Sequence, residues 1–306
     1  MTLRIGYIGL GALGRHLAGS LLKAGFPLTV YDIDRSCAAE LEKAGATWGG
    51  SVLETARSSD TVITCLPSPE AVDTVVGGER GVLEGLAPGG TWIEMSTNDA
   101  HNIQLLAARG AERGIETLES PVTGGVHRAA AGMITVLVGG SRDVYEKHRP
   151  AFEAMGGKVF YVGELGKASV IKVITNMLAF IHLVADGEAL MLAKQGGVDL
   201  GLAWEIIKAS SGNSFVHETE GQLILNGSYN INFTMDLARK DLHFAHMMGR
   251  EWGVPLDLAS VTEQTFARGR ATYGGDAQST MIVKLLEDAV GVDLRAPGFP
   301  DELQPE

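Results

Sequence analysis

Short apolar runs and amphipathic segments alternate along the first 163 residues. An apolar run at 3–8 precedes a helical pattern at 13–24, and the next apolar run covers 28–31. Further strands are expected at 47–48, 61–66, 91–95, 116–118, 135–139 and 158–162, and further helices at 37–44, 52–57, 71–76, 103–113 and 145–155. Strands that alternate with helices in this way are typical of parallel βαβ units, so the pattern predicts a doubly wound α/β sheet.

After residue 163 the pattern becomes helical, and strand signals are almost absent. Apolar residues follow helical spacing from Lys167 to about Lys194. Further helical patterns cover 202–209, 237–252, 256–268 and 280–291. We therefore predict an α/β domain at 1–163 and an all-helical domain at 164–292, joined through one long helix. Residues 293–306 contain three prolines and are expected to form a loose tail.

The long helix carries apolar residues on more than one face, namely Val170, Val173, Ile174, Leu178, Ile181, Leu183 and Leu190. One small domain cannot cover so wide an apolar surface, so we expect a second copy of the chain to pack there, in a homodimer or homotetramer. Polar residues interrupt the same stretch at Lys172, Asn176, His182, Asp186 and Glu188. A bilayer would not accept so many polar groups in one span, so no membrane association is expected.

Charge and cysteine content narrow the class of protein further. The chain has 306 residues, of which 25 are basic and 37 acidic, and its net charge is −12. An acidic surface repels phosphate backbones, which argues against nucleic-acid partners. Cys37 and Cys65 have no His or Cys neighbour at metal-ligand spacing, so no metal site is expected. The first residues lead straight into an apolar strand and leave no room for a signal peptide, so we expect a soluble, cytoplasmic protein.

A glycine-rich segment lies between the first strand and the first helix. Its sequence is Gly9-Leu10-Gly11-Ala12-Leu13-Gly14. This spacing in this setting is typical of a dinucleotide-binding loop, although a plain glycine loop is the structural alternative. In such a loop Gly9 allows the tight turn, Gly11 admits the pyrophosphate, and Gly14 lets the helix pack on the strand.

An acidic residue, Asp32, follows the second strand. A carboxylate there would accept hydrogen bonds from the ribose hydroxyls and repel a 2′-phosphate, so it favours NAD over NADP. Arg35 lies close enough in sequence to leave NADP open, and an ordinary strand-end cap is the alternative reading of Asp32.

Two further segments carry candidate chemistry. The first is Glu119-Ser120-Pro121-Val122-Thr123-Gly124-Gly125, where a hydroxyl and two glycines could form a backbone nest for a carboxylate, or a simple turn after an edge strand. The second places Lys172 and Asn176 one helical turn apart on one face of the long helix. Apolar neighbours would favour the neutral amine that acid–base catalysis needs, whereas a lysine in such a helix can also extend to solvent.

Together with the charged run Arg239-Lys240-Asp241-Leu242, which alone reads as a solvated face, these segments resemble the β-hydroxyacid dehydrogenase family. The resemblance covers about residues 3–292. Thr123 stands where the family's substrate motif has serine, and Ala168 where its lysine motif has a second glycine. The resemblance implies an N-terminal Rossmann domain and a C-terminal helical domain.

The resemblance also implies functional roles. The family oxidises small 3-hydroxy acids, such as 3-hydroxyisobutyrate, reversibly with NAD or NADP. The residues implied for the cofactor are Gly9, Leu10, Gly11, Ala12, Leu13, Gly14, Asp32, Leu66, Pro67, Thr97 and Lys240. Those implied for a small anionic substrate are Ser120, Thr123, Gly124, Gly125 and Asn176. Lys172 would be the general acid–base, oriented by Asn176, in a crevice where the first half presents the nicotinamide.

Two other functions stay open from the sequence. Imine reduction on the same architecture is one, but its enzymes usually carry another residue at the position of Lys172. A non-catalytic dinucleotide-binding scaffold or sensor is the other, but such proteins are expected to lose the lysine or to carry basic tails. The roles of Asn98, His127, Arg128 and the pair Asn213-Ser214 also stay open, either as distal substrate contacts or as surface residues.

Overall fold

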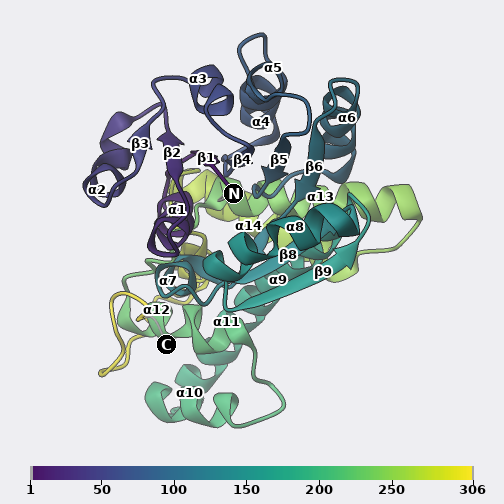
Figure 1. Ribbon diagram of the computed structural model, residues 1–306. Helices are drawn as coiled ribbons and strands as arrows, with labels where there is room; N and C mark the ends of the chain where they lie inside the picture. Colours follow the sequence, from purple (N-terminus) through teal and green to yellow (C-terminus); the bar gives the residue numbers. More distant parts are fainter. Residues whose placement is uncertain (1–2, 305–306) are drawn as a thin grey trace. The chain divides into compact units, whose positions relative to one another are not determined.

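The computed structural model describes residues 3–304, and the chain forms two compact units, one ending at Lys172 and one beginning at Val173. The first unit contains a nine-stranded sheet within the described residues (Figure 1). Its strands are β1 (Ile5–Ile8), β2 (Leu28–Tyr31), β3 (Thr47–Trp48), β4 (Thr61–Thr64), β5 (Thr91–Glu94), β6 (Glu116–Glu119), β7 (Val122–Thr123), β8 (Thr135–Gly140) and β9 (Lys158–Gly163). The order is β3-β2-β1-β4-β5-β6-β8-β7, and β9 pairs with β8.

Parallel pairing runs from β3 to β6, as the alternating pattern predicts. Beyond β6 the sheet differs from the prediction, because β8 runs antiparallel to both β6 and β7, and β6 therefore lies inside the sheet rather than at its edge. Leu118 pairs with Gly140 and Val122 with Val136, so β6 and β7 follow β8 in one register. Pro121 separates them because proline has no N–H to donate to the ladder.

Helices cover both faces of this sheet. They are α1 (Gly14–Lys23), α2 (Ala39–Lys43) after the short 3₁₀ helix η1 (Arg35–Ala38), α3 (Val52–Arg57), α4 (Pro69–Gly77), α5 (Val82–Gly85), α6 (Ala100–Ala111), α7 (Gly125–Ala130) and α8 (Arg142–Met155). Consecutive strand residues enter two different cores: Ile63 and Ile93 pack in one, and Val62 and Trp92 in the other. The expected doubly wound architecture is confirmed, although the short helices α5 and α7 were not predicted.

The second unit is helical. Helix α9 (Lys167–Gln195) starts in the first unit and continues through most of its length in the second. It is followed by α10 (Leu200–Lys208), α11 (Phe215–Glu218), α12 (Glu220–Asn226), α13 (Met235–Trp252), α14 (Asp257–Tyr273), the 3₁₀ helix η2 (Ser279–Ile282) and α15 (Lys284–Val290). Phe180, Leu190, Leu242 and Phe266 lie in its core. The predicted helical region is confirmed.

Part of the expected tail is held against this unit. Leu294 is fully buried, and the Ala296 N–H donates to the Leu225 carbonyl at 3.0 Å. Arg295 pairs with the buried Glu287 at 2.8 Å. Residues 294–296 therefore pack against the helical unit, which differs from the loose tail expected for 293–306.

By length and composition alone, α9 is the one helix among residues 3–304 that could cross a membrane, and 33% of its most apolar stretch is buried. Its Phe180, Leu183, Leu190 and Met191 belong to the core of the second unit. The core helix of a soluble protein can have the same length and composition, so these two properties alone are weak evidence for a membrane span.

Candidate active site

Packing requires two of the three motif glycines in the loop between β1 and α1. Gly9 has a φ of +97°, and a Cβ there would lie 2.2 Å from the Cys65 carbonyl oxygen. A Cβ on Gly14 would lie 2.0 Å from the Gly9 carbonyl oxygen. Gly11 is different, because no atom of the chain lies within 4 Å of its Cβ position. The loop therefore leaves open the one side through which a pyrophosphate would approach the backbone, so its residues fit a dinucleotide.

Asp32 is held beside this loop. The Leu10 N–H donates to Asp32 Oδ2 at 2.6 Å, and the Asp34 N–H donates to Oδ1 at 2.9 Å. Leu13, at the N-cap of α1, makes no side-chain hydrogen bond to the helix. The carboxylate is thus fixed at the end of β2, where ribose hydroxyls of a dinucleotide would lie.

Arg35 has partners of its own. Its guanidinium lies 5.4 Å from the centre of the Trp48 ring and 3.4 Å from Glu42. The Trp48 ring in turn packs against Tyr31. These contacts hold the guanidinium beside Trp48 of β3. They do not favour the contact with the 2′-phosphate of NADP that the sequence leaves open for Arg35.

A buried polar network fixes the segments after β4 and β5. Glu94 is fully buried; it accepts hydrogen bonds from the Ser96 N–H at 2.6 Å and the Thr64 hydroxyl at 2.7 Å. The Ser96 hydroxyl accepts from the Leu66 N–H at 2.7 Å. These bonds set the backbone around Leu66-Pro67 and Ser96-Thr97. Sequence reasoning missed Glu94, although a lone acid in the apolar run 91–95 was the available signal.

The segment after β6 forms a glycine turn. Gly124 has a φ of +123° and Gly125 a φ of +86°, a backbone region that favours glycine. Thr123 ends β7, and α7 begins directly after Gly124. The Ser120 side chain is fully buried, and its Oγ has no hydrogen-bond partner among the described residues. A buried hydroxyl without a partner is costly unless something outside the chain binds it.

Glu119 precedes this turn and reaches the start of α9. Its carboxylate is fully buried and accepts from the backbone N–H groups of Gly166 at 2.6 Å, Ala168 at 2.8 Å and Ser169 at 3.1 Å. The Ser169 hydroxyl also donates to it. Burial raises the pKa of Glu119, and these hydrogen bonds oppose that effect.

Lys172 lies one turn further along α9 and is only 9% exposed. Asn176 follows at i+4 on the same helical face. Its amide donates to Asp241 Oδ2 at 2.6 Å, and Lys240 Nζ lies 3.3 Å from Asp241 Oδ1. The fully buried Asp241 therefore links two residues that the sequence singled out separately. Its own role was missed, although it stands inside the run 239–242.

The residues left open by the sequence have local partners. Asn98 donates to Asn102 and accepts from the Asp99 N–H, each at about the ordinary hydrogen-bond length. Ser214 caps α11 by accepting from the His217 N–H. Asn213 donates to Glu218 at 2.7 Å. Turn and cap formation accounts for these contacts.

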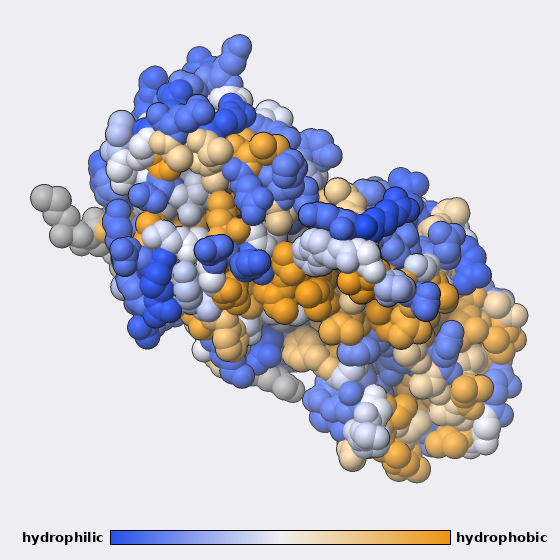
Figure 2. Space-filling model, turned by 90° about the vertical axis from the view of Figure 1, so that its right-hand side faces the viewer, coloured by the Kyte–Doolittle hydropathy of each residue, from blue (hydrophilic) through white to orange (hydrophobic). Residues whose placement is uncertain are grey.

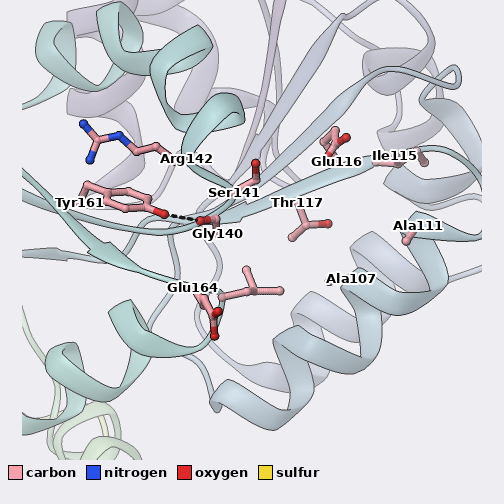
Figure 3. Close-up of a pocket in the computed structure, with 11 residues that line it drawn as sticks. Ala107, Ala111, Ile115, Glu116, Thr117, Gly140, Ser141, Arg142, Tyr161 and Glu164 are labelled. Atoms are coloured by element: carbon pink, nitrogen blue, oxygen red, sulfur yellow. Dashed lines mark hydrogen bonds between the residues drawn. The ribbon is translucent and has the colours of Figure 1, made fainter.

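A surface pocket of about 450 Å³ lies elsewhere in the first unit, between α6, the start of β6 and the ends of β8 and β9 (Figure 3). The Tyr161 hydroxyl donates to the Gly140 carbonyl on its wall at 2.9 Å. None of the residues assigned to cofactor or substrate lines it. Glu116 and Thr117 begin β6, so the pocket lies at the amino-terminal end of this strand, whereas the glycine loop follows the carboxyl end of β1.

Among residues 3–304 no three His, Cys, Asp or Glu side chains cluster as metal ligands would. The doubly wound sheet, a glycine loop open at Gly11, a fixed carboxylate at Asp32 and a helical second unit define a Rossmann-type, dinucleotide-binding protein.

Comparison with known proteins identifies the family. A model described as the NAD binding domain of 6-phosphogluconate dehydrogenase matches residues 4–163, and one described as the NAD-binding part of NADP-dependent 3-hydroxyisobutyrate dehydrogenase matches 166–286. The chain is 33% identical over 294 residues to 2-(hydroxymethyl)glutarate dehydrogenase of Eubacterium barkeri, covering 96% of this chain and 98% of that relative. It is 32% identical over 281 residues to L-threonate dehydrogenase of Escherichia coli K12, covering 91% and 93%.

A solved structure of 3-hydroxyisobutyrate dehydrogenase from Salmonella typhimurium superposes with a TM-score of 0.86 at 27% identity, over 92% of this chain and 99% of that one. The chain therefore belongs to the β-hydroxyacid dehydrogenase family, and it is an NAD(P)-dependent hydroxyacid dehydrogenase. The resemblance seen in the sequence is confirmed.

Proposed function

We propose that this enzyme interconverts a small anionic 3-hydroxy acid, similar in size to 3-hydroxyisobutyrate, and its aldehyde or ketone, with Lys172 as general acid–base. One observation carries the proposal: the Lys172 side chain is 9% exposed, one helical turn beyond the residues that Glu119 holds. A lysine in an apolar helix that only served solubility would extend to solvent.

Lys172 moves one proton in each direction of the reaction. A nicotinamide cofactor held by the glycine loop at 9–14 would supply the hydride acceptor for oxidation and the hydride donor for reduction. In oxidation the neutral Nζ of Lys172 removes the hydroxyl proton, and in reduction its ammonium returns that proton to the carbonyl oxygen. Asn176 keeps the substrate oxygen oriented on the same helical face, and Asp241 in turn fixes the Asn176 amide.

The glycine turn after β7 holds the substrate carboxylate. Gly124 and Gly125 can present N–H groups in a concave turn, and Thr123 adds a hydroxyl at its start. Within residues 3–304 the Ser120 hydroxyl has no hydrogen-bond partner, which supports a polar ligand beside it. The names of the relatives, which act on hydroxymethylglutarate and threonate, support a small hydroxy acid as substrate class.

NAD is the proposed cofactor in preference to NADP. The fixed Asp32 carboxylate would repel a 2′-phosphate, and the contacts of Arg35 with Trp48 and Glu42 support this preference. Leu66, Pro67 and Thr97 would line the cofactor, and Lys240 would lie beside it. A spectrophotometric screen of NAD and NADP reduction against small 3-hydroxy acids identifies both substrate and cofactor.

The remaining expectations belong to this proposal. The cofactor domain is 1–163, the helical substrate and dimerisation domain is 164–292, and 293–306 follows as the tail. The enzyme works in the cytoplasm as a homodimer or homotetramer, without nucleic-acid, membrane or metal partners. The net charge of −12 supports the exclusion of nucleic acid.

Substitution of Lys172 tests the proposal. Lys172→Ala is expected to bind NAD with unchanged affinity, since the glycine loop is untouched, and to lose about 100-fold or more in kcat because the proton has no carrier. NAD affinity is measured by calorimetry and kcat with the substrate found in the screen. Turnover above a few per cent of the parent enzyme contradicts the assigned role.

A further inference from the structure

The start of α9 lacks a local N-cap side chain. The first N–H groups of a helix have no partner inside it, and usually a Ser, Thr, Asp or Asn immediately before the helix accepts from them. Here Gly166 occupies that place, with a φ of +100°. The Lys167 N–H donates to the Glu164 carbonyl, and the Val170 N–H to the Gly166 carbonyl. The groups between them depend on a residue from elsewhere.

Glu119 supplies the missing acceptor from a strand 47 to 50 residues earlier in the chain. Both oxygens are used: Oε1 accepts from Gly166 and Ala168, and Oε2 accepts from Ser169. A negative carboxylate at this end of a helix also interacts favourably with the helix dipole. The contact thus combines hydrogen bonding and charge at one buried point.

The sheet makes room for this carboxylate. Gly139 is paired with Glu119 on the adjacent strand β8. A Cβ on Gly139 would lie 2.5 Å from Glu119 Oε1, so any larger residue there would displace the carboxylate. Glycine at 139 therefore leaves the space that the Glu119 carboxylate occupies.

We propose that Glu119 is a positioning residue for catalysis, which docks the first turn of α9 onto the end of β6 and thereby sets the place of Lys172 relative to the turn at 120–125. Ala168 and Ser169, whose N–H groups it accepts, stand four and three residues before Lys172 and so share its side of the helix. Ser120 follows Glu119 directly. The inference rests on the proposed roles of Lys172 and the 120–125 turn.

Glu119→Gln keeps the shape but replaces one acceptor oxygen by an NH₂ group that faces N–H donors. We expect kcat to fall 10- to 100-fold, since a small displacement of a catalytic group costs about that much, while the Kd for NAD stays within two-fold. Hydrogen exchange at the amides of Ala168 and Ser169 should speed up at least ten-fold.

Glu287→Gln is the matched control. Glu287 is 2% exposed and also docks a segment, accepting from the Leu294 N–H and from Arg295, but it touches no proposed site residue. This variant should melt at a lower temperature with unchanged kcat at 25 °C and unchanged exchange at Ala168. A Glu119→Gln enzyme that likewise loses only thermal stability overturns the inference.

Ser169→Ala decides the case if Glu119→Gln does not fold. It removes the one hydroxyl donor and leaves the three backbone donors in place, so kcat should fall two- to five-fold with NAD affinity unchanged. Parental kcat in that variant overturns the inference. Lys172→Ala distinguishes failure of the proposed function from failure of this inference. An active Lys172→Ala enzyme refutes the proposed function. An inactive Lys172→Ala enzyme together with a fully active Glu119→Gln enzyme refutes only the positioning role of Glu119.

Discussion

At the scale of single residues, the helical unit contains a buried histidine, His217, held between two hydrogen-bond acceptors. The Nδ1 of His217 lies 2.6 Å from Asp186 Oδ1, and its Nε2 lies 2.9 Å from the Trp204 carbonyl oxygen. A neutral imidazole donates from one nitrogen only, so two acceptors favour the imidazolium. Burial opposes the charge, but the hydrogen bond and the charge of Asp186 outweigh it, and the pKa of His217 is raised.

Glu220 lies close to this pair and titrates near neutrality. Burial of its carboxylate, together with the negative charge of Asp186, raises its pKa from 4.5 to about 7. The folded chain therefore binds this proton more tightly than the unfolded chain does. The stabilisation is complete below about pH 4.5 and is lost as the pH rises through 7.

The thermal midpoint (Tm) of the parent enzyme should therefore decrease as the pH is raised from 5 to 8. This fall reflects a decrease in the free energy of unfolding. Glu220→Gln, which cannot titrate, should remove on the order of 2 kcal/mol of that decrease. The raised pKa of His217 accounts for a remaining decrease above pH 6.5. Tm measured by calorimetry at four pH values between 5 and 8 checks this. Parallel Tm curves for parent and variant would contradict the assignment to Glu220.

At the scale of elements, two glycines of the loop between β1 and α1 are required for different reasons. A side chain on Gly14 would collide with the backbone of Gly9 in the same loop, whereas a side chain on Gly11 would meet no atom of the chain. Gly14 therefore allows α1 to pack on β1, and Gly11 leaves room for a ligand.

Gly14→Ala should therefore lower the unfolding free energy by about 2 kcal/mol or more through the backbone clash. Gly11→Ala should leave Tm within a degree or two and weaken NAD binding at least ten-fold, because its methyl group occupies the space of the pyrophosphate. Denaturation and calorimetry on both variants measure this. Tight NAD binding by folded Gly11→Ala would place the cofactor elsewhere.

The elements predicted from the sequence are those whose signals are local. Strands β1 to β5 and helix α9 were recognised from apolar runs and periodicity, because each buries its own face. The antiparallel course of β8 was missed, since pairing direction depends on a strand 20 residues away rather than on its own composition. The partners of Glu119 and Asp241 were missed for the same reason: each acts on an element distant in sequence.

At the scale of the whole molecule, apolar surface remains uncovered. Figure 2 shows hydrophobic residues over a broad area of one face. On α9, Leu178 is 44% exposed and Leu192 is 75% exposed, and α10 adds Leu202 and Ile206. Soluble proteins seldom leave so much contiguous apolar surface in water, which supports the proposed association of copies through this unit.

Light scattering at micromolar concentration should give at least twice the mass of one chain. Leu192→Glu should shift the enzyme towards monomer with little change in monomer stability, since that side chain is already solvent-exposed within one chain. Leu105→Glu, at an exposed leucine of α6, serves as the control and should leave the mass unchanged. A monomeric parent enzyme contradicts the prediction.

The capping of α9 by a strand residue also has a consequence for how the chain is made. During synthesis β6 leaves the ribosome before α9, so the acceptor for the first turn is already present when that turn emerges. A fragment that starts at residue 164 would lack this acceptor, and its longest helix would fray at the end that carries Lys172. The lysine would therefore lack its defined position in a helical half that is made without the strand carrying Glu119.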